Sequence, residues 1–342
     1  MVSSEGADPG AGGRWTAELQ QARLHFVSGK GGTGKSTVAA ALALAIASSG
    51  KKVLLVEVEG RAGIAPSFEV PDLPTTEQKI ATAASGGVVF ALSMDVEATF
   101  LDYLKTNYGM GMAARALRRI GAIEFATTLA PGLKDILITG KLMECTQRRE
   151  GDRYVYDAVV VDAPPTGRIG KFLDVTRAMR DIAKAGPISG QAERVVDLLH
   201  SPDTVVHLVT LLESLPVQES AEAAAELREL DLRLGAVVVN RALPRFLPDD
   251  LVPAFADARV DGPAVRTELA AAGLTVTDDA FAGLLAETID YARTLRGQEE
   301  ARRDLDRIAA GGPVLELPLL PDGVDLGGIY ELADRLTKAG AR

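Results

Sequence analysis

Gly29-Lys30-Gly31-Gly32-Thr33-Gly34-Lys35-Ser36 is the stretch of sequence that decides the fold, and it fits the pattern G-x-x-x-x-G-K-[ST]. An apolar run over residues 24–28 precedes it, and an alanine-rich segment follows it. Glycines let the backbone fold tightly enough for successive N–H groups to surround a phosphate, and the following helix adds the positive end of its dipole. The residues expected to bind a nucleotide here are Gly29, Gly31, Gly32, Thr33, Gly34, Lys35, Ser36 and Thr37.

Two side chains of this loop have expected roles of their own. Lys35 is expected to bridge the β- and γ-phosphates, and Ser36 to offer its hydroxyl to Mg2+. A glycine-rich turn that binds no ligand is the alternative. The strand before the motif and the helix after it favour the phosphate loop.

Short β-branched runs alternate with longer helical stretches over much of the chain. This alternation is typical of a parallel sheet with helices on both faces, and consecutive apolar residues are typical of strands that are buried on both sides. The sequence therefore predicts an α/β fold of the P-loop NTPase class, with a doubly wound, mainly parallel sheet flanked by helices. The seven expected strands cover residues 24–28, 53–58, 88–94, 158–162, 204–211, 235–240 and 314–317.

The ends and the strand-free regions set the expected domain organisation. Residues 1–22 are rich in Gly, Ala, Ser and acidic residues, and we expect them to form a mobile tail before one P-loop ATPase domain over residues 23–342. Two regions, about 97–150 and 249–310, lack the strand pattern. They are expected to form a helical subdomain that lies as a layer against the sheet.

Composition restricts the partners and the location. The net charge of −10 repels phosphate backbones, so nucleic acid is not expected as a partner. The single cysteine, Cys145, can form neither an internal disulfide nor a paired-cysteine zinc site, so no zinc is expected and a cytoplasmic location fits best. The longest apolar run, residues 38–47, reaches about half of the roughly 20 residues that a membrane span needs. We expect it to be a buried helix.

A second chemical signal lies where the apolar run 156–161 ends in Asp162. An acid at the end of a buried parallel strand sits at the carboxyl edge of the sheet, where nucleotides bind. Asp162 is therefore expected to act as the Walker B acid and to hold a magnesium-bound water. The segment that follows reads Ala-Pro-Pro-Thr-Gly-Arg, and a rigid turn at its two prolines is compatible with this role.

These motifs together resemble one family. The string GKGGTGKST is similar to the deviant phosphate loop shared by the arsenite-pump ATPases, the tail-anchored-protein-targeting ATPases, and the MinD and ParA ATPases. The segment from Asp162 to Arg168 resembles the second switch of the arsenite-pump branch, which reads Asp-Thr-Ala-Pro-Thr-Gly-His. The resemblance implies that Lys30 reaches across a dimer to the partner's nucleotide and that Gly167 presents its N–H to the γ-phosphate. A solvated surface lysine is the alternative for Lys30.

The chain also departs from that family pattern at two positions. The first switch normally reads Asp-Pro-Ala-His, and its Asp orients the attacking water; Glu59 stands at that position, and Arg168 stands where the family has His. A misplacement of about 1 Å in a positioned base can cost on the order of a hundredfold in rate, so hydrolysis is expected to be slow. By resemblance, Asn240 and the loop containing Pro318 and Pro321 contact the adenine, although an Asn at a strand end is also a common turn residue.

Three functions are compatible with these residues. The first is an ATP-hydrolysing switch, working as a homodimer or as a heterodimer with a paralogous ATPase, that drives a membrane-protein partner or a client in anion transport or protein targeting. Similar actinobacterial chains often occur as two unequal siblings. The second is a weakly hydrolysing, nucleotide-binding regulatory subunit, which Glu59 and Arg168 favour. The third, a small-molecule kinase, is disfavoured by Lys30 and by the second-switch pattern.

Overall fold

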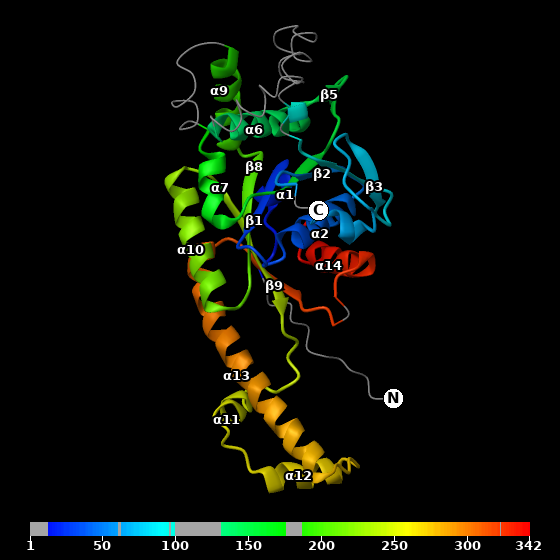
Figure 1. Ribbon diagram of the computed structural model, residues 1–342, viewed down its shortest axis with the longest axis vertical. Coiled ribbons are helices and arrows are strands. Elements are labelled where there is room, and N and C mark those ends of the chain that lie inside the picture. The colour runs from blue at the N-terminus through cyan, green and yellow to red at the C-terminus, as the bar shows by residue number, and fades with distance from the viewer. Residues whose placement is uncertain (1–12, 61–62, 96, 100–130, 176–186, 322) are drawn as a thin grey trace.

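The computed structural model describes residues 13–60, 63–95, 97–99, 131–175, 187–321 and 323–342 (Figure 1). Its centre is an eight-stranded sheet in the order β10-β9-β8-β1-β7-β2-β4-β3, parallel throughout except that β3 runs antiparallel to β4. The strands are β1 (Leu24–Gly29), β2 (Lys52–Glu57), β3 (Gln78–Thr82), β4 (Val88–Ser93), β7 (Ala158–Asp162), β8 (Thr204–Thr210), β9 (Leu234–Ala242) and β10 (Val314–Pro318). All seven predicted strands are confirmed, and the doubly wound class with them.

The sequence prediction missed β3 and a small hairpin of β5 (Arg149–Glu150) and β6 (Arg153–Tyr154). β3 is an edge strand that is mostly exposed, and its sequence Gln-Lys-Ile-Ala-Thr has no apolar run. The central strands β1, β7 and β8 are buried at every residue and produce the continuous apolar pattern that sequence can reveal. Strands that pair at an edge carry a weaker signal.

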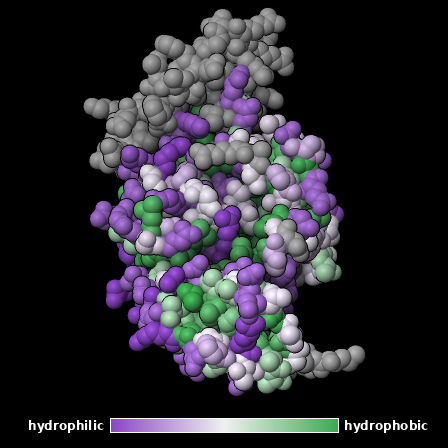
Figure 2. Space-filling view, turned by 60° about the horizontal axis from the view of Figure 1, so that its bottom comes forward, coloured by the Kyte–Doolittle hydropathy of each residue, from purple (hydrophilic) through white to green (hydrophobic). Residues whose placement is uncertain are grey.

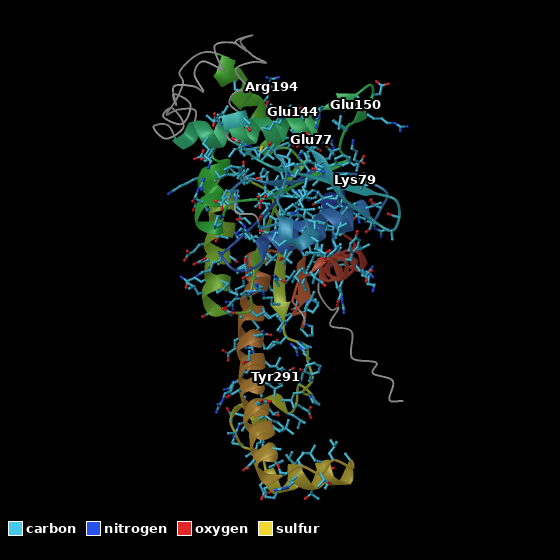
Figure 3. All side chains as sticks on the ribbon, turned by 45° about the vertical axis from the view of Figure 1, so that its right-hand side comes forward. Glu77, Lys79, Glu144, Glu150, Arg194 and Tyr291 are labelled. Atoms are coloured by element: carbon cyan, nitrogen blue, oxygen red, sulfur yellow. The ribbon has the colours of Figure 1, made fainter. Side chains whose placement is uncertain are left out.

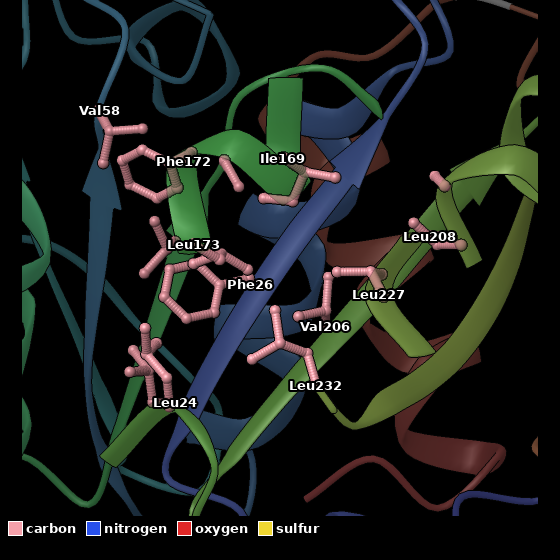
Figure 4. Packing of buried hydrophobic residues seen from close by; sticks show 14 of the residues in the cluster. Leu24, Phe26, Val58, Ile169, Phe172, Leu173, Val206, Leu208, Leu227 and Leu232 are labelled. Carbon is pink, nitrogen blue, oxygen red and sulfur yellow. The ribbon is translucent and has the colours of Figure 1, made fainter. Parts of the chain in front are cut away.

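Helices cover both faces of the sheet and create two apolar cores. On one face lie α1 (Ala17–Gln21), α2 (Lys35–Ala47) and α14 (Leu326–Lys338). On the other lie α6 (Pro131–Gln147), α7 (Thr166–Leu173), α9 (Pro187–Leu199), α10 (Ser214–Glu229) and the second half of α13 (Asp278–Ala309). α2 is buried from Val38 to Ala47, as predicted. Figure 4 shows the second core, where Phe172 of α7 packs beside Phe26 of β1.

The N-terminal segment corrects one prediction. Residues 1–12 lie outside the described residues, but residues 13–22 pack on the domain. The Gly13 N–H donates to the Val314 carbonyl at 2.8 Å, Trp15 is 5% exposed and Leu19 is 4% exposed. The prediction of a mobile tail is wrong for this part, because a single Trp and a single Leu anchor a short stretch whose composition is otherwise polar.

Residues 249–310 contain α11 (Val252–Ala256), α12 (Gly262–Ala271) and α13, together with the loops between them. The buried residues of α13 all lie in its second half, from Ala292 to Ala309, and α12 has no buried residue. In Figure 1, α13 runs from beside α10 to the far end of the molecule, where α12 lies. The second half of α13 packs on the sheet as the expected helical layer does, whereas α11, α12 and the first half of α13 form an arm that projects from the domain.

The arm carries exposed apolar side chains and is hydrogen-bonded to the loop after β9. Leu274 is 56% exposed and Leu284 is 46% exposed, and Figure 2 shows apolar and hydrophilic residues mixed on this end of the molecule. Tyr291, midway along α13 in Figure 3, accepts a hydrogen bond from the Phe246 N–H at 2.9 Å and donates one to the Pro244 carbonyl. These bonds attach the loop after β9 to the arm.

Of the other expected helical region, about 97–150, α6 is described, whereas residues 100–130 lie outside the described residues. None of the described helices combines the length and the apolar character that crossing a membrane requires.

Candidate nucleotide site

The Gly-rich loop lies between β1 and α2, and Asn240 of β9 fastens it. Gly34 is the N-cap of α2 with φ of +88°, a left-handed conformation that glycine adopts without strain. The Asn240 Nδ2 donates to the Thr33 carbonyl at 2.8 Å and lies so close that a Cβ on Gly34 would stand 2.2 Å from it. Any residue other than glycine at position 34 would therefore be strained by the positive φ and would clash with the Asn240 side chain.

The turn of the loop is closed from within and open on the outside. The Thr33 hydroxyl donates to the Lys30 carbonyl at 2.8 Å, and the Thr33 N–H approaches the same oxygen at 3.3 Å. A Cβ built on Gly31 or Gly32 would meet no atom within 4 Å. The loop therefore has open space beside Gly31 and Gly32 for a bound phosphate.

Ser36 and Asp162 form the polar centre of the site. The Ser36 hydroxyl donates to Asp162 Oδ2 at 2.5 Å, and Asp162 Oδ1 is buried without a hydrogen-bond partner among the described residues. Burial raises the pKa of Asp162 to about 6; Ser36 and Lys35 oppose the rise, and Glu57 and Glu59 add to it. A desolvated carboxylate with an unpartnered oxygen beside a hydroxyl suits a hydrated divalent cation, so these residues fit Mg2+.

Glu57 holds the first-switch loop over this centre, a role that the sequence interpretation missed. It ends β2 in register beside Asp162, is 3% exposed, and accepts hydrogen bonds from the Gly63 N–H at 2.9 Å and the Ser93 hydroxyl at 3.3 Å. A Cβ on Gly63 would lie 2.5 Å from the Ser36 hydroxyl. The signal that revealed Asp162, an acid that ends an apolar strand, applies equally to Glu57.

Glu59 and Arg168, the two departures from the family pattern, contact each other. Arg168 Nη1 lies 3.2 Å from Glu59 Oε1, and Arg168 Nη2 lies 3.6 Å from Asp135 Oδ1 on α6. Glu59 is held well inside the surface, whereas the Arg168 side chain is half-exposed. The two switch segments are therefore joined by a salt bridge.

The second switch is anchored to the strand that carries the Gly-rich loop. The Ser28 hydroxyl of β1 donates to the Pro164 carbonyl at 2.6 Å. Pro165 is the N-cap of α7, so Gly167 lies in the first helical turn, where backbone N–H groups have no partner within the helix. Gly167 thus presents a donor at the helix start, as expected for a residue that contacts an anion.

The loop predicted to contact adenine lies beside the end of β9. Pro318 ends β10 in register with Ala242, and the Leu319 N–H donates to the Ala242 carbonyl at 2.9 Å. Pro321 lies in the turn that follows. The segment therefore lies beside the end of β9, the strand whose Asn240 contacts the Gly-rich loop.

Lys30 has a partner that the sequence did not indicate. Its Nζ lies 2.8 Å from Glu219 Oε1 on α10, and the two side chains are 29% and 32% exposed. The positions are separated by 189 residues, so no local pattern connects them. In the single chain the lysine is thus paired within its own subunit, near the surface.

Comparison with known proteins decides the family. A family model described as anion-transporting ATPase matches residues 22–196. The chain is 55% identical to ATPase BagA of Mycobacterium tuberculosis over 100% of this chain and 99% of the relative. It is 24% identical both to an ATPase ASNA1 homolog of Entamoeba histolytica (64% of this chain, 76% of the relative) and to ATPase GET3 of Rhodotorula glutinis (65% and 59%). The chain belongs to the ArsA ATPase family.

As an ArsA-family ATPase the protein binds and hydrolyses ATP. The carboxyl edge of its sheet brings together the Gly-rich loop, both switch segments and Asn240. β2 pairs with β7, side-chain hydrogen bonds join β1 and the Gly-rich loop to the second switch, and Asn240 of β9 bonds to the Gly-rich loop. Sequence reasoning named most of these residues. It missed three that organise them, namely Ser28, Glu57 and Glu219.

Proposed function

We propose that this ArsA-family ATPase is a cytoplasmic, nucleotide-gated dimer in which ATP closes two subunits and hydrolysis reopens them. The observation that carries the proposal is the position of Lys30. This lysine belongs to the Gly-rich loop, yet its amine is turned to Glu219 near the surface and is not used within the loop. Such a residue is suited to exchange its partner for a phosphate on a second subunit.

The remaining roles in the proposal follow from the site. Lys35 bridges the β- and γ-phosphates, and Gly167 donates its N–H to the γ-phosphate. Ser36 would hold Mg2+ through its hydroxyl and Asp162 would hold it through water, and the unpartnered Asp162 oxygen supports this assignment. Glu59 orients the attacking water, while Asn240, Pro318 and Pro321 lie against the adenine. The magnesium ion neutralises charge on the phosphates when it is bound.

Dimer closure is the step that would be coupled to other proteins. The description of the family as anion-transporting supports a membrane-protein partner or client of the transport or targeting type. The second subunit is either an identical chain or a paralogous ATPase. In either case the coupling uses differential affinity for the open and closed states.

Two substitutions test the core of this proposal. Lys35→Ala is expected to abolish ATP binding, because it removes the cation that bridges two phosphates. Lys30→Ala is expected to keep ATP binding and to lose turnover, because its contribution arises only in the closed dimer. Calorimetric titration with Mg-ATP and steady-state phosphate release measure the two effects. A Lys30→Ala variant that hydrolyses ATP at the normal rate would contradict action in trans.

One observation favours a second function, that of a weakly hydrolysing regulatory subunit. Glu59 is engaged in a salt bridge with Arg168 and is longer than the family's Asp. Phosphate release by the chain alone, compared with release after a paralogous subunit is added, separates the two functions. A regulatory subunit shows little turnover alone and raises that of its sibling.

A further inference from the structure

Arg168 joins three segments that are far apart in the sequence. Its guanidinium lies 3.2 Å from Glu59 of the first switch and 3.6 Å from Asp135 of α6, while its backbone belongs to the first turn of α7 in the second switch. Each contact uses a different terminal nitrogen. The planar fork is therefore held at both tips, which fixes its orientation better than a single ion pair would.

Asp135 is a suitable anchor because it is itself confined. Its Oδ1 is buried with no hydrogen-bond partner in the described part of the chain, although it lies within ion-pair distance of Arg168. Burial raises the pKa of Asp135 to about 6, and the charges of Arg168 and Lys134 act against that rise. At neutral pH the carboxylate is thus ionised and depends on these cations for stabilisation.

A contact that orients the carboxylate matters more for Glu59 than it would for an aspartate at the same position. Glutamate has one more rotatable bond than aspartate, and ordering a free side chain costs entropy. An open pocket of about 150 Å3 adjoins the pair, lined among others by Ile138, Pro164 and Phe172. Glu59 itself lines this pocket, so its side chain lies beside open space.

We propose that Arg168 is a positioning residue that sets the orientation of the Glu59 carboxylate through their salt bridge, with Asp135 as its anchor. The inference rests on the proposed function, in which Glu59 orients the attacking water. Glu59 and Arg168 are then one paired replacement for the Asp and His that the family pattern has at these positions. Arg168 acts on catalysis only through Glu59, and α6 is connected to the reacting centre through Arg168.

A double-mutant cycle tests this directly. Single variants Arg168→Met and Glu59→Gln, the double variant, and Arg168→Lys are compared by steady-state phosphate release in the full chain, together with any sibling subunit that activity requires. Lys171→Met is the matched control, since Lys171 lies exposed on the same helix. Arg168→Met is expected to lower kcat about tenfold with less than about a twofold change in KM for ATP. Arg168→Lys restores part of kcat, and Lys171→Met leaves it unchanged.

The decisive result is the double variant. If Arg168 acts only through Glu59, the double variant has the kcat of Glu59→Gln, because the residue to be positioned is already lost. A double variant slower than Glu59→Gln by the full Arg168→Met factor overturns the inference. So does an Arg168→Met variant with unchanged kcat, or one whose main effect is on KM. Normal turnover in Glu59→Gln instead refutes the water-orienting role in the proposed function, so the two failures are distinguishable. Thermal unfolding of each variant separates misfolding from these outcomes.

Discussion

At the scale of single residues, the ion pair of Lys30 and Glu219 is short, but it contributes little to the free energy of folding. Both side chains are about one-third exposed, and pairs of this kind contribute roughly 0–1 kcal/mol to stability because water and salt screen them. Breaking the pair is therefore a small cost. In the proposed dimer, a phosphate bound to the second subunit carries more charge than Glu219 and can compete for the same amine.

This competition gives a test. Glu219→Gln removes the charge that holds Lys30 in its own subunit, so we expect ATP-dependent dimerisation at a lower protein concentration, by about twofold to fivefold. Analytical ultracentrifugation with Mg-ATP measures the shift. Glu222→Gln is the control, because Glu222 is exposed on the same helix and accepts a hydrogen bond only from Gln218 among the bonds described. Weaker dimerisation of Glu219→Gln would mean that Glu219 supports the interface.

The sequence predicts the residues of the site better than their partners. The Gly-rich loop and Asp162 are recognisable because their chemistry depends on spacing along the chain and on an adjacent strand. The salt bridge of Glu59 and Arg168 joins positions 109 residues apart, and only the folded sheet brings the two switch segments together. Both departures were visible in the sequence, but nothing in it showed that they contact each other.

At the scale of secondary-structure elements, burial decides which predictions succeed. β1, β7 and β8 are fully buried and carry continuous apolar runs, whereas β3 at the edge does not and was missed. The helical pattern of residues 249–310 is equally clear in the sequence. The place of these helices in the fold cannot be predicted in the same way. Helical periodicity shows that a helix forms, but it does not show whether the helix packs on the sheet or projects from it.

Among the described helices, those of the arm should therefore be the least stable. α12 has no buried residue and the first half of α13 contributes none, so their opening exposes little apolar surface. We expect backbone amides of α12 and residues 278–290 to exchange with deuterium at least about tenfold faster than those of residues 292–309. Hydrogen-exchange mass spectrometry of the chain without partner measures this. Equal protection along α13 would show that the arm is stabilised by contacts beyond those described.

At the scale of the whole molecule, a buried pair of histidines links the N-terminal segment to the centre of the sheet. The Ala236 N–H donates to His207 Nδ1 at 2.9 Å, so the proton of His207 must be on Nε2, which lies 3.1 Å from His25 Nδ1. The His25 proton is then on Nε2 and is donated to the Ala22 carbonyl at 3.0 Å. Trp15 stacks on His207 with ring centroids 5.0 Å apart. Both rings are neutral, and a second proton on either would break this chain of hydrogen bonds.

The stability of the fold should consequently fall in acid. Burial lowers the pKa of His25 to about 4, and the pKa of His207 lies well below its ordinary value for the same reason. In the unfolded chain both rings bind protons near pH 6.5, so between pH 6.5 and pH 4 the unfolded state binds more protons and acidification favours it. The loss is on the order of 3 kcal/mol for His25 when the pH reaches 4. Burial raises the pKa of Asp135 and of Asp162, so the folded state binds protons at these two groups more readily than the unfolded state does. Acidification therefore favours the folded state at these carboxylates, opposite to its effect at the histidines.

A matched comparison isolates the histidines from these carboxylates. In the variant His25→Gln/His207→Gln, each amide can accept and donate as the neutral imidazole does but cannot be protonated in this range. Urea unfolding at pH 7.5, 6.5, 5.5 and 4.5 should give the wild type a steeper loss of unfolding free energy than the variant below pH 6.5. If the double variant follows the wild type through the same range, the histidine pair does not control acid stability, and the N-terminal segment must detach before the rings are protonated.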